Sequence, residues 1–576
     1  MPRAACAALL GLLAAGPAWA QATRPAAQVP QGSPIPRLLP RTPPSVGAGP
    51  APLPQAGPSG PVPNVSVLVR NVAVNGATAY PAARLAKLTA GLIGPAVKLA
   101  RIEAARQAIL DLYRRDGYLL TAVSASLDKT GDLRFSVTEG RVVAVKLQGH
   151  IGPAGTMVLR FLNHLTHERP VNIAGLERWL LLAQSVPGVT LRTVLRPSAA
   201  EPGALTLVAE VSRQAVSGLY TADNRGYVNT GPEEELGVFD LNSVTEFGDK
   251  TEVSLFHTFN NTQTFGQVAS SFFVGDSGLR VRLYGGAGQA TPSGQLRAIG
   301  YHGYTDVFGA SATYPVIRRR QQTLDLTASF DALESEIDTA SAVGGGNVRA
   351  SFDSLRVARI GITYAREDVL LGANRSAVNV ATLRFSHGLP ILGATRDGDP
   401  QAGRLNERTD FWKLNAQVSR TQTLFEPWQG ATVALEGIVA GQVTSDVLPT
   451  AEEFYLGGSQ YTRGFYAGEV TGDNALAGTV ELQLNTGMQV HAFGRPYNIA
   501  AQFYGFYDYG ETWQNQKLDP NHRVASAGGG VRFNLTRYAE VDLEGVARFT
   551  RRVDAGSPTV PALSPASFYW RVLLRF

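Results

Sequence analysis

The segment YTRGFYAGEV, residues 461–470, places a single arginine, Arg463, among glycines and aromatic residues. Segments that resemble β-strands surround it. An arginine in such a segment is either an ordinary solvated loop charge or one half of a buried ion pair, in which a guanidinium and a carboxylate share two parallel hydrogen bonds. Spacing along the chain does not name a partner by itself, and on that ground alone the solvated charge is the simpler interpretation.

Residue types that carry catalysis or bind metals are few or poorly spaced. The only cysteine, Cys6, lies in the apolar N-terminal stretch, so a processed chain has no disulfide, thiol nucleophile or cysteine metal site. The eight histidines show no H-x-x-x-H or similar ligand spacing, and we interpret His164 and His167 as a solvated helix end. No phosphate-binding glycine loop and no G-x-S-x-G element occurs. These patterns predict a protein that is not an enzyme and has no metal or cofactor.

The composition narrows the class of protein. The chain has 576 residues and a net charge of +5 from 52 basic and 47 acidic side chains. This charge is too weak to indicate a nucleic-acid partner, because no basic block is interleaved with aromatic residues. Only 17% of the residues are charged, 61 are glycine, and the mean hydropathy is -0.04. Such values are typical of an all-β surface or outer-membrane protein.

The first 64 residues predict an export signal and a linker. Residues 1–20 combine Arg3, an apolar core and the sequence Ala18-Trp19-Ala20, which is the pattern of a cleavable secretory signal peptide. A membrane anchor is the alternative, but glycines and a proline interrupt a stretch that is already short for spanning a bilayer. Residues 21–64 hold 13 of the 34 prolines and predict a disordered or polyproline-II linker, with no stable helix at residues 35–39.

Two copies of one pattern follow, at residues 65–141 and 142–214. Each copy has a strand, two helices and two strands, and the second copy begins almost without a linker. The expected helices are 81–93 and 99–115 in the first copy and 157–165 and 172–184 in the second. In the helix 99–115, Ile102 and Ile109 lie on one apolar face. The repeat predicts two small α+β domains in tandem.

Residues 215–576 lose the helical pattern and alternate between apolar and polar side chains. In the last segment, aromatic and aliphatic residues ending at Phe576 alternate with Arg571 and Arg575. This alternation is typical of a transmembrane β-barrel with its apolar face outward. A soluble β-sandwich also alternates, but the charged inner face and the terminal aromatic residue favour the barrel. At ~20–24 residues for each strand with its loop, the segment predicts about 16 antiparallel strands.

Four short motifs connect these parts to a known family. They are RRDGYLLTAV (114–123), SVTEGRV (136–142), SVPGVTLRTVLRP (185–197) and ADNRGYVNTG (222–231). The first three resemble signatures of POTRA domains, and the fourth resembles the first barrel strand and turn of the two-partner secretion transporters, the haemolysin secretion/activation family (ShlB/FhaC/HecB). The resemblance covers nearly everything from residue 64 onward. It implies a mostly β fold in which two tandem POTRA domains precede a transmembrane β-barrel.

A further motif contains Arg463. Thr462-Arg463-Gly464-Phe465 resembles the VRGY motif of the family, which lies on a long extracellular loop that folds back into the barrel lumen. Thr replaces Val and Phe replaces Tyr, so a hydroxyl is lost at Phe465. We expect Gly464 to let the backbone turn sharply and approach the barrel wall.

The segment FYDYG supplies a candidate partner for Arg463. Phe506, Asp508 and Gly510 match the F-x-D-x-G motif of the family, which lies on a barrel strand. In the family the arginine of the loop motif contacts this aspartate. The resemblance therefore implies an ion pair between Arg463 and Asp508 that pins the loop in the lumen, and we expect Gly510 to leave room for the loop tip.

The resemblance also implies a function and a location. The protein would be a pore in the outer membrane of a Gram-negative bacterium, inserted by the barrel-assembly machinery and surrounded by outer-membrane lipids. Its POTRA domains would capture an unfolded exported partner, such as a haemolysin or adhesin, in the periplasm, and the barrel would secrete it and in some cases activate it. One alternative is an outer-membrane protein assembly factor, which usually has more POTRA domains. Another is a porin or receptor, which lacks them.

Overall fold

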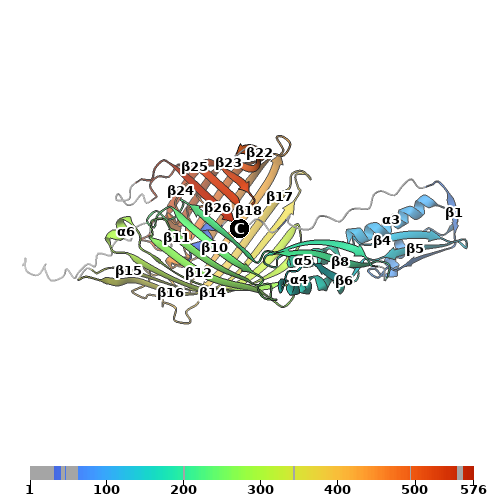
Figure 1. Cartoon of the computed structure of the whole chain (residues 1–576), viewed down its shortest axis with the longest axis horizontal. Helices are drawn as coiled ribbons and strands as arrows, with labels where there is room; N and C mark the ends of the chain where they lie inside the picture. Colours follow the sequence, from blue (N-terminus) through green and yellow to red (C-terminus); the bar gives the residue numbers. More distant parts are fainter. Residues whose placement is uncertain are drawn as a thin grey trace, which may run out of the picture.

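The computed structural model describes residues 32–39, 46, 63–198, 201–341, 344–492, 495–553 and 562–576, without the side chains of Arg37, Gln295 and residues 490–497. The predicted signal peptide and most of the predicted linker lie outside these residues. Two small units of helices and sheets form one end of the molecule, and a β-barrel forms the other (Figure 1). None of the helices in the described ranges is long and apolar enough to cross a membrane.

The first unit consists of residues 63–140. Its elements are β1 (Ser66–Val69), β2 (Asn71–Asn75), α2 (Ala82–Leu88), β3 (Gly94–Lys98), α3 (Leu99–Arg115), β4 (Ala122–Leu127) and β5 (Asp132–Thr138). One sheet has the order β2-β5-β4, with β2 parallel to β5, and β1 and β3 form a separate antiparallel pair. The predicted apolar face of α3, including Ile102 and Ile109, is buried in the core of the unit.

One helix of the first unit is shorter than its sequence pattern predicts. Instead of continuing to residue 93, α2 ends at Leu88, and Gly94–Lys98 forms a strand rather than a simple helix stop. Val97 of that strand pairs with Val67 of β1 and is buried. A strand partner about 30 residues away in the sequence therefore decides the local structure, which a helical periodicity does not reveal.

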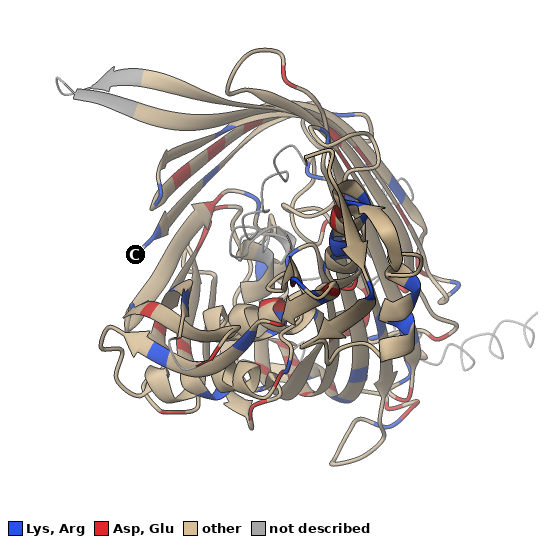
Figure 2. Cartoon of the chain, turned by 90° about the vertical axis from the view of Figure 1, so that its right-hand side faces the viewer, with Lys and Arg blue, Asp and Glu red and all other residues tan. Residues whose placement is uncertain are grey.

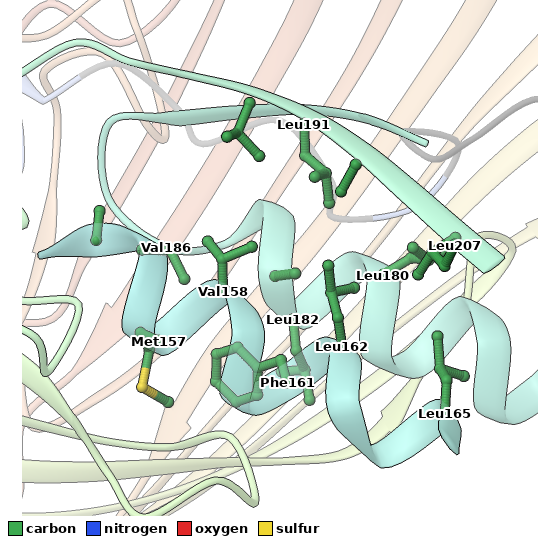
Figure 3. Packing of buried hydrophobic residues seen from close by; sticks show 14 of the residues in the cluster. Met157, Val158, Phe161, Leu162, Leu165, Leu180, Leu182, Val186, Leu191 and Leu207 are labelled. Atoms are coloured by element: carbon green, nitrogen blue, oxygen red, sulfur yellow. The ribbon is translucent and has the colours of Figure 1, made fainter. Parts of the chain in front are cut away.

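The second unit consists of residues 141–213 and has the predicted strand, two helices and two strands. Its elements are β6 (Arg141–Gln148), α4 (Ala154–Asn163), the 3-10 helix η1 (His164–Thr166), α5 (Ile173–Gln184), β7 (Val189–Pro197) and β8 (Ala204–Arg213). The sheet has the order β6-β8-β7, with β6 parallel to β8. The two helices bury Phe161, Leu162 and Leu180 in a common core with Leu191 and Leu207 of the sheet (Figure 3).

Sixteen antiparallel strands close into a barrel. They are β9 (Val216–Asp223), β10 (Glu234–Asn242), β11 (Lys250–Thr258), β12 (Gln263–Val274), β13 (Leu279–Ala290), β14 (His302–Arg318), β15 (Gln322–Ala340), β16 (Asn347–Asp368), β17 (Ala377–Gly388), β18 (Trp412–Phe425), β19 (Thr432–Val443), β22 (Asn474–Ala492), β23 (Arg495–Trp513), β24 (His522–Thr536), β25 (Ala539–Arg548) and β26 (Ala566–Arg575). The last strand pairs with the first, with Arg571 opposite Asp223, and so closes the barrel. The predicted fold class and strand number are confirmed.

Side chains along the strands alternate between the lumen and the outer surface. On β11, Glu252, Ser254 and Phe256 are buried toward the lumen, whereas Val253 and Leu255 are 47% and 58% exposed on the outside. Acidic and basic positions occur on strands around the barrel (Figure 2). Along β11 the outward face is therefore apolar, as a lipid-facing wall must be, and the inward face carries polar and acidic side chains.

The C-terminal residue lies at the seam where the barrel closes. The backbone N–H of Phe576 donates to the carbonyl of Gly218 on β9 at 3.1 Å, and its carbonyl accepts from the Gly218 N–H at 3.0 Å. The Phe576 side chain is 55% exposed on the outside of the barrel. The predicted terminal signature thus belongs to the pairing of the last strand with the first.

A short helix stands inside the barrel where the sequence predicts none. The helix α1 (Ile35–Leu38) buries Ile35 and Leu38 against inward-facing residues of the wall, including Leu236 and Phe256. The prediction that residues 35–39 form no helix is therefore wrong. Four residues cannot hold a helix in water, so contacts with the lumen wall stabilise it, and local sequence does not contain that information.

His164 lies between the second unit and the barrel. Its ring stacks on Trp179 with the centroids 3.8 Å apart, and Nε2 lies 3.1 Å from Asp276 Oδ2 in the turn between β12 and β13. The interpretation of His164 as part of a solvated helix end is therefore wrong. The helix end packs against a barrel turn that is more than 100 residues away in the sequence.

Candidate functional site

Residues 444–473, between β19 and β22, fold back into the barrel, and we call them the lumen loop. The loop contains the 3-10 helix η2 (Thr450–Glu452) and the paired short strands β20 (Phe454–Leu456) and β21 (Val470–Gly472). Its tip carries the predicted motif. Thr462, Arg463 and Phe465 are 0%, 3% and 0% exposed, so the tip is packed against other parts of the chain and not free in the lumen.

The guanidinium of Arg463 pairs with the carboxylate of Asp508 on β23. Nε lies 3.0 Å from Oδ2 and Nη2 lies 3.1 Å from Oδ1, so the contact is bidentate. The backbone N–H of Arg463 also donates to Oδ2 at 2.8 Å. Asp508 is fully buried. The structure thus brings together the two charges that the motifs single out, in a geometry that fixes the orientation of the loop tip.

Arg463 has further partners that the sequence reasoning missed. Its Nη1 pairs with Glu481 of β22 and lies 4.0 Å from Glu544 Oε2 of β25. The guanidinium carbon lies 3.6 Å from the ring centroid of Phe506, a cation–π contact that gives the aromatic residue of the strand motif a role. Strand alternation marks both glutamates as lumen-facing, but only the folded barrel shows that they meet one arginine.

Gly464 contacts the barrel wall through its backbone. Its carbonyl accepts hydrogen bonds from Arg548 Nε and, at 3.1 Å, from the Tyr569 hydroxyl, and its N–H donates to Ser526 Oγ at 3.3 Å. A Cβ at this position would lie 2.5 Å from the Cβ of Ser526. Glycine therefore allows the loop backbone to approach the wall closely enough for these bonds.

The left-handed turn of the tip falls on Thr462, with φ 52°, and not on Gly464. This conformation costs energy for a β-branched residue. The Thr462 hydroxyl accepts the N–H of Gly457 at 2.8 Å, a bond that a valine at this position cannot make. On the strand behind it, a Cβ on Gly510 would lie 2.7 Å from Thr462 Cγ2. Gly510 therefore leaves the space that the turn occupies.

Phe465 fills an apolar pocket beside the tip. It is fully buried with Leu456 and Val470 of the lumen loop and Val524 of β24. The phenyl ring packs among these apolar side chains, and the guanidinium carbon of Arg548 lies 5.9 Å from its centroid.

Arg225 ties the loop tip to the beginning of the barrel. It lies in the turn after β9, where its Nη1 donates to the carbonyl of Arg463 at 2.8 Å and its Nη2 to Glu544 Oε1 at 2.6 Å. Its guanidinium carbon lies 4.2 Å from the ring centroid of Tyr569. The motif at 222–231 contains this arginine, but neither its spacing nor its type indicated a contact with the lumen loop.

Comparison with known proteins assigns the family. The model of the haemolysin secretion/activation protein family, ShlB/FhaC/HecB, matches residues 205–533, more than half of the chain. The chain belongs to this family. The model of the ShlB-type POTRA domain matches residues 67–140, which is the first unit.

Individual relatives of this chain are distant in sequence but cover most of its length. The outer membrane transporter CdiB of Escherichia coli O6:K15:H31 (strain 536 / UPEC) is 22% identical over 545 residues, which cover 92% of this chain and 85% of the relative. The hemolysin transporter protein ShlB of Serratia marcescens is 23% identical over 441 residues, which cover 73% of this chain and 72% of the relative.

Solved structures share the fold. The structure of CdiB from Escherichia coli has a TM-score of 0.68 at 18% identity and covers 93% of this chain and 94% of its own. The structure of CdiB from Acinetobacter baumannii has a TM-score of 0.61 at 15% identity, with coverages of 89% and 91%. As a member of this family, the chain is an outer-membrane barrel with its POTRA end in the periplasm. The loops at the other end, including the lumen loop, begin on the extracellular side.

The lumen loop of this family member has a second charged anchor, at Glu452 of η2. Arg359 of β16 binds it in a bidentate contact, with Nη2 2.6 Å from Oε1 and Nη1 3.0 Å from Oε2. Lys413 of β18 contributes an Nζ 2.8 Å from Oε2, and Arg359 also binds Asp331 of β15 at 2.8 Å. The loop is therefore held by charges on two separate parts of the wall.

A cavity of about 910 Å³ lies in the lumen between these anchors and α1. Ser33 and Pro36 line one part of it, and Gln460 of the lumen loop and Arg359 of the wall line another. Over the described residues, no three His, Cys, Asp or Glu side chains are grouped so as to hold a metal ion. The chemistry that the site offers is charge pairing and backbone hydrogen bonding around a partly filled passage.

Proposed function

We propose that this protein is a pore that secretes one exported partner protein across the outer membrane. The observation that supports this most directly is the buried ion pair between Arg463 and Asp508, which holds the lumen loop inside a closed barrel. A relative bearing the name hemolysin transporter protein fits the same activity. In this proposal the ion pair is the contact that breaks when the lumen loop moves and a polypeptide passes.

The two periplasmic units are proposed to capture the unfolded partner. In the described part of the second unit, β7 pairs only with β8, so β7 forms an edge of the sheet. An extended segment of the partner can add to such an edge through main-chain hydrogen bonds, which tolerate variation in its side chains. Delivery of the captured segment into the barrel would then require displacement of both the lumen loop and α1. Folding of the partner outside the cell would drive the transfer.

The surroundings of the barrel are part of the proposal. Outer-membrane lipids would cover the outward apolar positions, such as Leu255 and Phe308, which are 58% and 62% exposed. The barrel-assembly machinery would insert the protein and would recognise the last strand, β26, together with Phe576 directly after it.

The decisive experiment is secretion by an Arg463→Ala variant. The substitution leaves Asp508 buried without the cation that binds it, at a cost of about 3–5 kcal/mol, and removes one of the two arginines at Glu481, so the loop tip loses its fixed position. We expect secretion of the partner exoprotein to fall at least about tenfold, because an unpinned loop diffuses in the lumen and an anchoring loss of that size exceeds one decade in an equilibrium. The double variant with Asp508→Ala is expected to be no worse than the single one, because both act through one contact.

Two controls frame this experiment. Arg523→Ala removes an exposed pair with Glu511, 67% and 20% exposed, and should leave secretion unchanged because such pairs contribute little. Heat-modifiable migration on gels reports whether each barrel has assembled. Normal secretion by an assembled Arg463→Ala barrel would contradict the role of the loop. Loss of many other outer-membrane proteins on depletion would instead indicate an assembly factor.

A further inference from the structure

The lumen loop leaves the barrel wall and returns to it at almost the same place. Asp473, just before β22, is fully buried, and its Oδ1 accepts the backbone N–H of Leu448 at 2.8 Å. Gln442, at the end of β19, donates to the Asp473 carbonyl at 2.9 Å. We call this junction of residues 448 and 473 the neck of the lumen loop. By strand register it lies nearer the extracellular end of the barrel than Asp508, the partner of Arg463, because Asn474 pairs with Trp513.

A single arginine from another extracellular loop closes the neck. Arg404 belongs to residues 389–411, between β17 and β18, and is 3% exposed. Its Nη1 donates to the Leu448 carbonyl at 2.6 Å and to Asp473 Oδ1 at 2.7 Å, so it binds both ends of the lumen loop at once. The same nitrogen lies 3.2 Å from Glu453 Oε1.

The other side of the guanidinium reaches a third extracellular loop. Arg404 Nη2 donates to Asp519 Oδ2 at 2.8 Å and to Gln514 Oε1 at 3.1 Å, both between β23 and β24. The backbone of Arg404 is itself fixed, because its N–H donates to Glu407 Oε2 at 2.7 Å. One buried cation therefore joins three extracellular loops over the mouth of the barrel.

We propose that Arg404 is a positioning residue that clasps the neck of the lumen loop and keeps the extracellular mouth closed. Asp473 and Glu453 are buried carboxylates, and Arg404 supplies the cation that allows them to remain there. The lumen loop can move as a unit only when this contact opens, in addition to the contact of Arg463 with Asp508. The inference rests on the proposed function, since it describes how that pore is kept closed.

The test is the open fraction of single channels in planar lipid bilayers, which requires no exoprotein. Arg404→Gln removes the cation, and we expect the open fraction to rise about fivefold or more, the size of a typical coupling between sites. The matched control is Arg396→Gln in the same loop, because Arg396 is an exposed surface arginine. An open fraction that stays at the parent value, or rises equally in the control, would overturn the proposal.

A second variant guards against misfolding of the first. Asp519→Asn keeps Arg404 but removes one of its charged partners, so we expect a smaller rise in the open fraction with normal heat-modifiable migration of the barrel. No rise in either assembled variant refutes the clasp. This test is independent of the secretion test. If the open fraction rises in Arg404→Gln, the clasp is supported even when the parent protein secretes no exoprotein. If the parent protein secretes an exoprotein but the open fraction of the variants is unchanged, the pore is supported and the clasp is rejected.

Discussion

At the scale of single residues, the loop tip is a balanced charge cluster and not one isolated pair. Arg532 of β24 binds Glu481 at 2.8 Å, so the glutamate that meets Arg463 also meets a second arginine. Glu544 in turn receives Arg225. Glu481 and Glu544 keep Arg532 and Arg225 when the tip leaves, but Asp508 loses the guanidinium of Arg463, so the buried network is fully satisfied only when the tip is in place. When the tip leaves the wall, Asp508, Glu481 and Glu544 therefore all lose their contact with Arg463.

The close contact between Gly464 and the barrel wall gives a prediction in which a second substitution, at Ser526, should reverse the effect of the first. Gly464→Ala places a Cβ 2.5 Å from the Ser526 Cβ, and such overpacking costs about 1–3 kcal/mol. We expect the tip to move away from the wall, with a higher open fraction in bilayers and normal barrel assembly.

Ser526→Gly in the same chain removes the atoms that the new methyl group meets. The double variant should therefore return the open fraction toward the parent value, although the hydrogen bond from the Gly464 N–H to Ser526 is lost. An open fraction that is unchanged in Gly464→Ala would show that the tip does not require this close approach.

The sequence predicts the motif residues of the site but not the network around them. Two short motifs are enough to propose that Arg463 and Asp508 meet. Glu481 and Glu544 come from strands whose alternation shows only that they face inward. Their meeting with Arg463 depends on strand register and on the path of the loop, and neither leaves a signature in local sequence.

At the scale of elements, the spacing of apolar residues predicts a helix or strand correctly when the element is long enough to show that spacing over several residues. The long helix α3 and the barrel strands follow their patterns closely. The prediction failed for β3 and α1, which are short and depend on a partner far away in the chain. Val97 needs β1, and Ile35 needs the wall of the barrel. A short element of this kind has too few residues to show a period.

The extracellular loop 389–411 gives a prediction about pH. Burial, followed by the charge of Asp353, raises the pKa of Glu407 to about 9. This is above the value of ~4.3 for an unfolded glutamate, so the protonated form belongs to the folded loop. The stability that this group contributes is fully present below pH ~4.3 and is lost as pH rises through about 9. Glu407 holds the backbone N–H of Arg404, so we expect the open fraction to rise at pH 10 relative to pH 7.

The variant Glu407→Gln tests this assignment. A glutamine keeps an acceptor for the Arg404 N–H and does not ionise, so the rise between the two pH values should be smaller than in the parent protein. Asp410→Asn in the same loop is the control, because Asp410 is on the surface with 37% of its side chain exposed. An equal rise in the parent protein and in Glu407→Gln would assign the pH response to other groups.

At the scale of the whole molecule, the second unit is joined to the barrel by specific contacts. Phe273 of β12 belongs to the apolar core of the second unit and meets Phe161 edge-on, with the ring centroids 5.2 Å apart. Glu177 of α5 accepts the backbone N–H of Arg320 in the turn between β14 and β15. The tandem repeat and the barrel are each visible in the sequence. Their relative placement is not, because it depends on side chains that meet only after both parts have folded.

Arg178 of α5 is the side chain that should decide this placement. Its Nη1 donates to the Pro315 carbonyl at 2.8 Å and its Nη2 to the Ser277 carbonyl at 3.1 Å, on two neighbouring periplasmic ends of the barrel. Hydrogen bonds from a charged donor contribute about 1.5–3 kcal/mol each, so Arg178→Ala should loosen the junction without unfolding either part.

The distance between α5 and the barrel, measured between spin labels on added cysteines, tests this prediction. We expect a broader distance distribution in Arg178→Ala and an unchanged, narrow one in the control Arg192→Ala, on the exposed face of β7. If the junction guides the captured partner into the barrel, the variant with the broader distance distribution, Arg178→Ala, must also secrete less of the partner. Equal widths in both variants would show instead that apolar packing around Phe273 alone holds the two parts together.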